Sequence, residues 1–230
     1  MAEELTFNQD TATEYDRGIR RTLPTYDGLV RLTTTALRME TDENANVLVI
    51  GAGGGNELVE FSKLNPEWTF TAADPSEPML AEARAKVEAQ IESERVKFVA
   101  GSARDVPSDH QFDAASCLLV LHFIEDEEAK VELLWEIRKR LKPGAPFVLA
   151  SMVGDREDPS FEELFKLWRH SWVDRSSLSE AQVLEMEKIV RALSFVPLGT
   201  IVELLREAGF VRITQFFQTT FFSAWMCVAE

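Results

Sequence analysis

Three glycines, Gly51, Gly53 and Gly55, stand at every second position directly after an apolar run, and together they could form a ligand site. Glycine has no Cβ, so it tolerates positive φ and lets a ligand approach the backbone closely. A short buried strand over 47–50 that enters such a loop and continues into a helix is typical of a site for a nucleotide-like ligand. A glycine-rich turn that only reverses the chain is the alternative.

The spacing of these glycines also limits the ligand. The dinucleotide fingerprint is G-x-G-x-x-G, whereas here the third glycine comes one residue early. No Lys-Ser or Lys-Thr pair follows the loop, so it offers no evident grip for a phosphate. The pattern favours a ligand with an adenosine and an uncharged or zwitterionic tail.

An acidic residue, Asp74, ends the second expected strand, about 20 residues after the glycines. A carboxylate at this place typically accepts hydrogen bonds from ribose hydroxyl groups and repels a 2′-phosphate. Alternatively, Asp74 caps the next helix, because Pro75 stands at a suitable first helical position. Ser76 is a second candidate for the cap, and if it serves, Asp74 is left for the ligand.

The composition excludes several classes of partner. The 230 residues carry a formal net charge of −15, which argues against nucleic acid, because phosphate contacts need clustered Lys and Arg. Cys117 and Cys227 lie in apolar runs and are expected to be buried free thiols. No two of the three histidines stand at metal-ligand spacing, so no metal is expected. No apolar run approaches about 18 residues and no signal-peptide pattern occurs, so we expect a cytoplasmic protein without a membrane partner.

Strand-like and helical patterns alternate from residue 46 onward, and these elements must position the glycines and Asp74. Strands are expected over 47–50, 69–73, 96–99, 115–121, 146–152, 211–217 and 222–229, and helices near 57–64, 78–90, 127–141 and 200–208. This predicts an α/β fold: a Rossmann-like, seven-stranded, mostly parallel sheet with a C-terminal antiparallel hairpin and helices on both faces. Right-handed crossovers would bring the carboxyl ends of the strands, and so the site, to one edge of the sheet.

Two helical segments lie outside this alternation. Residues 1–45 contain two helices broken at Pro24, and we expect them to form an N-terminal lid. Residues 153–198 are charged and helical, and we expect them to be an insertion packed over the active site. The remaining residues, 46–152 and 199–230, would form the Rossmann-like domain that binds the ligand.

Five short motifs in this order resemble those of the class I S-adenosylmethionine-dependent methyltransferases. They are VLVIGAGGG (47–55), AADPS (72–76), FDAASCLLVLHF (112–123), RLKPGA (140–145) and LLREAGF (204–210). The resemblance covers about residues 40–152 and 198–230. It implies S-adenosylmethionine as the cofactor and in-line transfer of its methyl group to an unidentified small molecule.

The resemblance also implies which residues hold the cofactor. They are Gly51, Ala52, Gly53 and Gly55 under the methionine part, Asp74 at the ribose, Pro75, Met79, Ser102 and Ala103 at the adenine, and Leu119 beside the sulfonium. This chain departs from the family at two positions, since Val49 and Ser102 stand where an acidic residue is common. Each loss is expected to weaken cofactor binding by about 1 kcal/mol if no other group substitutes.

The substrate should be contacted by the lid, the insertion and the end of the fourth strand. His122 is the candidate general base, because it follows the fourth strand beside the expected methyl group; a packed or capping histidine is the alternative. Other candidate substrate residues are Tyr15, Arg20 and Tyr26 in the lid, Phe123 after the fourth strand and Trp168 in the insertion. Packing is the alternative for the tyrosines and the tryptophan, and a solvated helix face is the alternative for the arginine.

A closer resemblance is to the carboxy-S-adenosylmethionine synthase group. It rests on YDRGIRRTLPTYD (15–27), FEELFKL (161–167) and the aromatic final hairpin. That group holds the extra carboxylate of its cofactor with an arginine of the insertion, whereas a loose alignment offers Glu185, Glu187 and Lys188 here, with Arg191 nearby. We therefore expect ordinary S-adenosylmethionine. A carboxy-S-adenosylmethionine synthase-like enzyme and a non-catalytic protein that binds S-adenosylmethionine stay open as alternatives, as does a homodimer.

Overall fold

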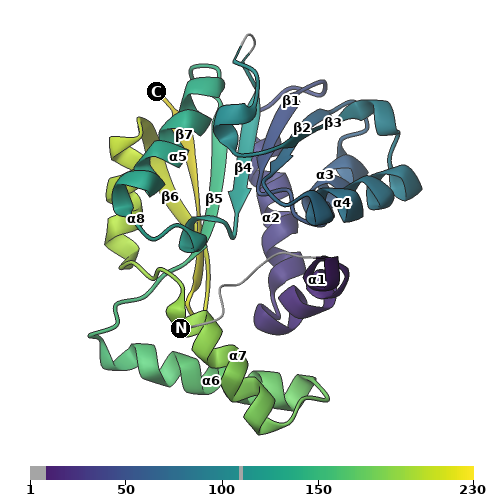
Figure 1. Ribbon diagram of the computed structural model, residues 1–230. Helices are drawn as coiled ribbons and strands as arrows, with labels where there is room; N and C mark the ends of the chain where they lie inside the picture. The colour runs from purple at the N-terminus through teal and green to yellow at the C-terminus, as the bar shows by residue number, and fades with distance from the viewer. Residues whose placement is uncertain (1–8, 109–110) are drawn as a thin grey trace.

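Seven strands form one sheet in the order β3-β2-β1-β4-β5-β7-β6 (Figure 1). The structure is a computed structural model that describes residues 9–108 and 111–230. The strands are β1 (Asn46–Ile50), β2 (Thr69–Asp74), β3 (Val96–Ala100), β4 (Ala114–Leu118), β5 (Pro146–Met152), β6 (Phe210–Thr219) and β7 (Phe222–Ala229). Strands β1 to β5 pair in parallel, and β7 runs antiparallel to both β5 and β6. This confirms the expected Rossmann-like α/β fold with its C-terminal antiparallel hairpin.

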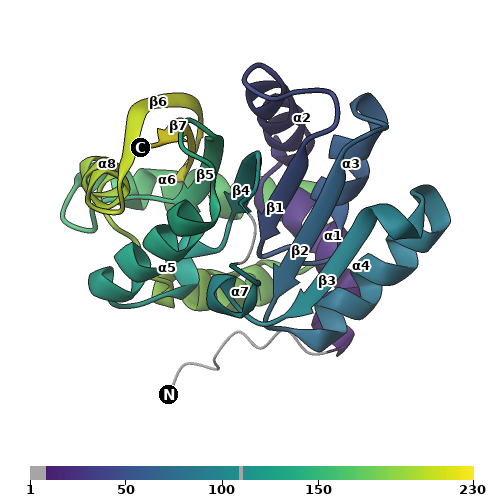
Figure 2. The same cartoon turned by 90° about the horizontal axis from the view of Figure 1, so that it is seen from above.

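Helices cover both faces of the sheet, as the view along it shows (Figure 2). They are α1 (Gln9–Thr22), α2 (Tyr26–Arg38), α3 (Asn56–Leu64), α4 (Glu77–Gln90), α5 (Glu127–Arg140), α6 (Pro159–Arg175), α7 (Glu180–Ala192) and α8 (Leu198–Glu207). On one face, Leu29 of α2 and Phe61 of α3 share a buried cluster with Val49 of β1. On the other, Ile137 of α5 and Leu205 of α8 belong to a second cluster. None of the helices in the described residues is both long and apolar enough to cross a membrane.

The fourth strand is shorter than the sequence pattern predicts. The apolar run over 115–121 suggested a strand that continues to Leu121, but β4 ends at Leu118. Leu119 adopts a left-handed conformation with φ of 62°, and Leu121–Phe123 form a short 3-10 helix, η3. A left-handed residue other than glycine costs roughly 1–2 kcal/mol, and such strain clusters at functional sites. The turn redirects the chain at the edge where the parallel strands end.

Helices α6 and α7 form a hairpin at the lower end of the sheet in Figure 1, where α6 also contacts α1. Asp158 caps α6, and Ser179 forms a capping box with Gln182 at the start of α7. Aromatic side chains join the hairpin to the rest of the fold, since the ring of Phe165 stacks on that of Phe221 with 4.8 Å between centroids. Buried aromatic rings contribute strongly to packing because each removes about 150–250 Å² from water. The end of α7 is thereby held against the strand ends.

Candidate active site

A cavity of about 750 Å³ lies where the carboxyl ends of β1, β2 and β4 meet. This edge is the usual ligand site of open parallel sheets, and the volume suits a small molecule. Helices outside the sheet also contribute to its wall, among them α1 with Tyr15, α5 with Leu133, and the end of α7 with Ile189 and Leu193. Residues from both the expected lid and the expected insertion therefore line one cavity.

The glycine loop presents bare backbone to this cavity. Gly51 and Gly53 line it with φ of 70° and 48°, values that residues with a Cβ rarely adopt. A Cβ added to Gly51 would collide with the side chain of Val120, and one added to Gly53 would lie 3.3 Å from Cε of Met79. The close approach of a ligand to these two residues therefore depends on their being glycine.

Asp74 is buried at the end of β2 and lines the cavity beside the glycine loop. Its Oδ2 accepts a hydrogen bond from the backbone N–H of Gly53 at 2.9 Å, and its Oδ1 accepts one from that of Ser76 at 2.9 Å. Burial raises the pKa of this carboxyl, while the two backbone bonds act in the opposite direction. An ionised carboxylate has about four acceptor positions, so two remain for the hydroxyl groups of a ribose.

The helix cap after β2 is the serine. Ser76 precedes α4, and its Oγ accepts a hydrogen bond from the backbone N–H of Met79 at 3.3 Å. Asp74 is thus not the side chain that caps α4, and the second of the two alternatives for the cap is confirmed. Pro75 and Met79, which were expected near an adenine, both line the cavity.

Ser102 lines the cavity at the end of β3 and is held in a capping box with Asp105. Its backbone N–H and its hydroxyl donate to Oδ2 of Asp105 at 2.8 and 3.0 Å. The hydroxyl oxygen accepts from the N–H of Asp105, which leaves it one lone pair for a ligand donor. Of the other expected cofactor residues, Leu119 lines the cavity, whereas Ala52, Gly55 and Ala103 lie outside its lining.

His122 lines the cavity but is poorly suited to act as a general base. It is buried, and burial together with the nearby charge of Lys130 lowers its pKa to about 3. The backbone N–H of Met152 donates to its Nδ1 at 3.3 Å, which places the ring proton on Nε2. The ring is therefore neutral, with Nδ1 engaged by the backbone. This geometry suits a hydrogen-bond donor rather than the proton acceptor that the sequence suggested.

Glu57 is a buried carboxyl that the sequence reasoning missed. It lies in the first turn of α3, and its Oε2 accepts a hydrogen bond from Oγ of Ser116 on β4 at 2.9 Å. Burial raises its pKa to about 8, the Ser116 bond opposes this, and the charge of Asp74 adds to it. Its position four residues before Phe61 was the available signal, because this spacing puts both side chains on the buried face of one helix.

No lysine or arginine occurs among the described residues that line the cavity. Arg191, the nearest candidate in the insertion, binds Glu162 and Glu187 at 2.8 Å each, and its guanidinium lies 4.0 Å from the centroid of the Phe165 ring. Lys130 donates to the carbonyl oxygens of Ile124 and Glu125 and to Oγ of Ser194. Both cations are therefore committed to structural contacts.

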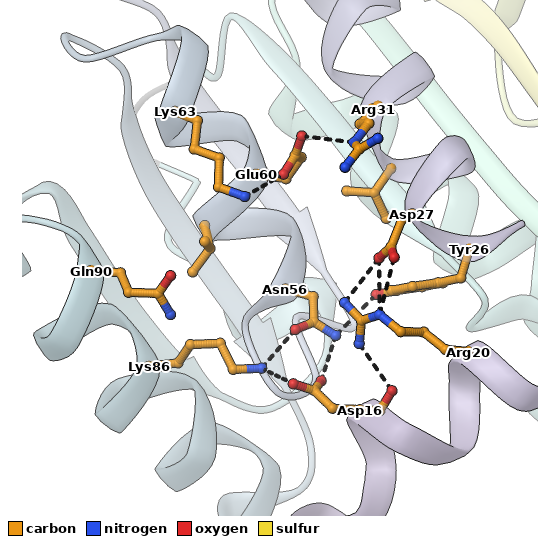
Figure 3. Close-up of a pocket in the computed structure, with 12 residues that line it drawn as sticks. Asp16, Arg20, Tyr26, Asp27, Arg31, Asn56, Glu60, Lys63, Lys86 and Gln90 are labelled. Atoms are coloured by element: carbon orange, nitrogen blue, oxygen red, sulfur yellow. Dashed lines mark hydrogen bonds and ion pairs between the residues drawn. The ribbon is translucent and has the colours of Figure 1, made fainter.

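Arg20 and Tyr26 line a different cavity, of about 340 Å³, between α1, α2, α3 and α4 (Figure 3). Arg20 pairs with Asp27 at 2.9 Å there, and the hydroxyl of Tyr26 contacts Nδ2 of Asn56 at 3.4 Å. Neither Arg20 nor Tyr26, both expected to contact the substrate, is among the residues that line the cavity at the strand ends.

Trp168 also lies away from the cavity at the strand ends. It is buried among aromatic rings, and its indole N–H donates to the carbonyl oxygen of Thr22 at 3.1 Å. It thus packs the insertion against the end of α1, which is the alternative that the sequence left open. Of the five expected substrate residues, the structure brings only Tyr15 and Phe123 to the cavity.

The chain is similar to methyltransferases in sequence and in fold. Residues 47–144 match the family model of a methyltransferase domain. The chain is 24% identical over 232 residues to carboxy-S-adenosyl-L-methionine synthase of Desulfotalea psychrophila. This alignment covers 99% of this chain and 93% of that protein.

Two solved structures show the same fold at low identity. A candidate O-methyltransferase of Nostoc punctiforme superposes with a TM-score of 0.66 at 16% identity, over 96% of this chain and 59% of that one. Human N-acetylserotonin methyltransferase in complex with S-adenosylmethionine gives a TM-score of 0.57 at 18% identity, over 100% of this chain and 60% of that one. This chain therefore spans about three fifths of the length of both solved chains.

Proposed function

We propose that this chain is a class I S-adenosylmethionine-dependent methyltransferase that methylates a small molecule, since residues 47–144 match a methyltransferase domain and solved methyltransferases share its fold. The observation that carries the proposal is the arrangement of Gly51, Gly53 and Asp74 around one cavity. The bare backbone of the glycine loop and, directly beside it, a buried carboxylate oriented by two backbone N–H groups line the same cavity.

The residues present fit S-adenosylmethionine. We propose that Asp74 accepts from the ribose hydroxyl groups, Ser102 accepts from the adenine amino group, and Pro75 and Met79 contact the adenine. Leu119 and Phe123 would border the sulfonium, whose charge is attracted to carbonyl oxygens and aromatic faces. The cavity of about 750 Å³ has room for more than the cofactor alone, so an acceptor can share it.

The chain's own contribution to the reaction is alignment. When bound, S-adenosylmethionine supplies a methyl group on a sulfonium, and the electron pair of the acceptor forms the new bond as the carbon–sulfur bond breaks. We propose that the glycine loop and Asp74 fix the cofactor and that the end of α7, which lines the cavity, helps to shield the bound reactants from water. His122 can orient the acceptor by donating from Nε2. Holding two reactants in line and away from solvent is the main source of acceleration for such a displacement.

A carboxy-S-adenosylmethionine synthase-like activity is the second candidate, since four curated relatives with that name match nearly the full chain. Such an enzyme must hold an additional carboxylate. A buried anion without a partner is strongly disfavoured. Because the described lining contains no lysine or arginine and Arg191 is engaged elsewhere, we propose ordinary S-adenosylmethionine as the cofactor.

Titration calorimetry with S-adenosylmethionine tests the proposal directly. We expect the wild-type protein to bind it, and Asp74→Asn to weaken binding by about 10- to 100-fold, because hydrogen bonds to a charged group contribute about 1.5–3 kcal/mol. Asp174→Asn, at an exposed position of α6, is the matched control and should bind like the wild type. Absence of heat from the wild type at millimolar cofactor would contradict the proposal.

A further inference from the structure

The polarity of the cavity lining changes from β3 toward η3. The order β3-β2-β1-β4 places Ser102, Asp74 and Gly51 at the ends of three successive strands, and η3 follows the end of the fourth strand in this order, β4. The wall on the η3 side is apolar and is formed by Phe123 of η3, Leu133 of α5, and Ile189 and Leu193 at the end of α7. Since the cofactor groups lie toward β3, this apolar part is the space left for the acceptor.

The charges around this space exclude an anion. Among the described lining residues the charged side chains are the carboxylates Asp74 and Glu125. Lys130, whose charge acts on the lining residue His122, and Arg191, the sequence neighbour of the lining residue Ala192, are held by hydrogen bonds and ion pairs to other groups. An acceptor that carried a carboxylate or phosphate would lose its hydration without gaining a counter-charge, which is strongly unfavourable. A neutral or cationic group is compatible with the same wall.

The need to remove a proton from the acceptor further limits its chemical class. A hydroxyl or thiol acceptor usually needs a base shielded from solvent, but Nδ1 of His122 is engaged by the N–H of Met152 and the carboxylate of Glu125 is exposed to solvent. An amine nitrogen in its uncharged form needs none, because its lone pair attacks directly. The positive charge then moves from sulfur to nitrogen, and any remaining N–H proton leaves to water afterwards. The exposed carboxylate of Glu125 complements such a cationic product.

From these three observations we infer that the acceptor is an apolar amine, held by the wall formed by Phe123, Leu133, Ile189 and Leu193. This inference rests on the proposed methyl transfer and specifies its substrate class. Ile189 is the residue of this wall that best tests it. It is partly exposed on α7, so a longer side chain can be accommodated, and it lies on the helix whose end lines the cavity.

The experiment compares two probes of the same shape and opposite charge, naphthylmethylamine and naphthoate, by calorimetry on protein saturated with S-adenosylhomocysteine. We expect the wild type to bind the amine at least about tenfold more tightly than the carboxylate. Ile189→Arg should reverse or abolish this preference, whereas Leu184→Arg, on the exposed face of the same helix, should leave it unchanged. Ile189→Gln introduces a polar but uncharged side chain. It therefore separates the effect of the added charge from the effect of losing the apolar contact.

The outcomes distinguish failure of the amine assignment from failure of the methyltransferase proposal. Binding of S-adenosylhomocysteine without heat from the amine, or equal affinity for both probes, overturns the amine assignment and leaves the methyltransferase proposal intact. An unchanged preference in Ile189→Arg also overturns it, because the wall would then not contact the acceptor. Failure of the wild type to bind S-adenosylhomocysteine defeats both. If Ile189→Arg does not fold, the comparison of Ile189→Gln with the wild type still decides, since loss of amine affinity is expected in that variant as well.

Discussion

Glu57 places an ionisable group inside the fold, close to the ligand site. Its carboxyl is buried between α3 and β4 with Ser116 as its partner, and its pKa is raised to about 8 from an ordinary value of 4.5. Tyr15 lines the cavity, and the burial of its own hydroxyl together with the charges of Glu57 and Asp74 raises its pKa. At neutral pH the free protein therefore holds Glu57 largely in its protonated form.

This shift makes the stability of the protein depend on pH. Because the folded-state pKa lies above the unfolded one, the contribution of Glu57 to stability is fully present below about pH 4.5 and is lost as pH rises to about 8. We expect Glu57→Gln to flatten the pH dependence of the free energy of unfolding in that window, as measured by urea denaturation. Glu67→Gln, at an exposed position, is the control and should retain the wild-type slope. An unaltered slope in Glu57→Gln would contradict the assignment.

The protonation state of His122 can be observed directly. With Nδ1 accepting from Met152 and a pKa of about 3, the ring should stay in the neutral Nε2–H form from pH 8 down to about pH 5. Imidazole ¹⁵N chemical shifts followed over pH measure this, with the signals of exposed His170 as an internal reference. Titration of His122 near its ordinary value of 6.5 would restore it as a candidate general base.

At the scale of elements, α1 is held by a small polar cluster. The carboxylate of Asp16 binds Nζ of Lys86 on α4 and Nδ2 of Asn56 at the start of α3, each at 2.6 Å (Figure 3). Nζ of Lys86 also donates to Oδ1 of Asn56 at 2.6 Å. Tyr15 is the neighbour of Asp16 and is the residue of α1, among the side chains that the structure describes, that lines the ligand cavity, so the cluster positions it at the site.

The lid function expected for the N-terminal residues can be tested at this cluster. Asp16→Asn removes the ion pair but keeps the size of the side chain, so α1 should open more often and the cofactor should dissociate faster. We expect a rise of roughly 2- to 10-fold in the dissociation rate constant, corresponding to about 0.5–1.5 kcal/mol, measured by stopped-flow fluorescence. Glu14→Gln breaks an exposed pair with Arg17 on the same helix and should have no effect. Equal rates in both variants would mean that α1 does not gate the site.

Helix α2 behaves differently from α1, although both belong to the expected lid. Its residues Tyr26, Leu29 and Val30 are buried in the cluster that covers one face of the sheet. An element that supplies this much core cannot open without exposing it to water, at about 25 cal/mol per Å² of apolar surface. Any gating movement should therefore be confined to α1.

At the scale of the whole molecule, charge favours a cationic ligand. The chain carries a net charge of −15, and carboxylates rather than cations are found among the described lining residues. S-adenosylmethionine bears a sulfonium, whereas its carboxylated derivative adds a negative charge that would face the same wall. The field of the protein and the local chemistry thus act in the same direction.

We therefore expect S-adenosylmethionine to bind at least about tenfold more tightly than carboxy-S-adenosylmethionine in a competition assay, because the additional carboxylate would be desolvated without a partner. S-adenosylhomocysteine, which lacks the charge on sulfur, serves as the reference ligand at the same ionic strength. Tighter binding of the carboxylated compound would favour the synthase-like alternative instead.

Features that depend on neighbouring residues could be predicted from the sequence alone. The alternation of strand and helix predicted the sheet, the glycine spacing predicted the loop at Gly51 and Gly53, and Asp74 was recognised by its place at a strand end. Backbone conformation and the face of a helix or strand are local properties, because they follow from sterics and from periods of 3.6 and 2 residues. The left-handed turn at Leu119 was missed because its apolar neighbours also suit a strand.

Tertiary structure alone decided which distant side chains meet. It brought Ile189 and Leu193 to the cavity and turned Arg191 toward Glu162 and Glu187. It also placed Arg20 and Tyr26 in a separate cavity. Periodicity shows that a helix has an apolar face but not which element covers it, since that is set by the packing of all layers together. The proposed cofactor side of this cavity can therefore be predicted largely from local sequence, whereas the proposed acceptor side forms only when α7 packs at the strand ends.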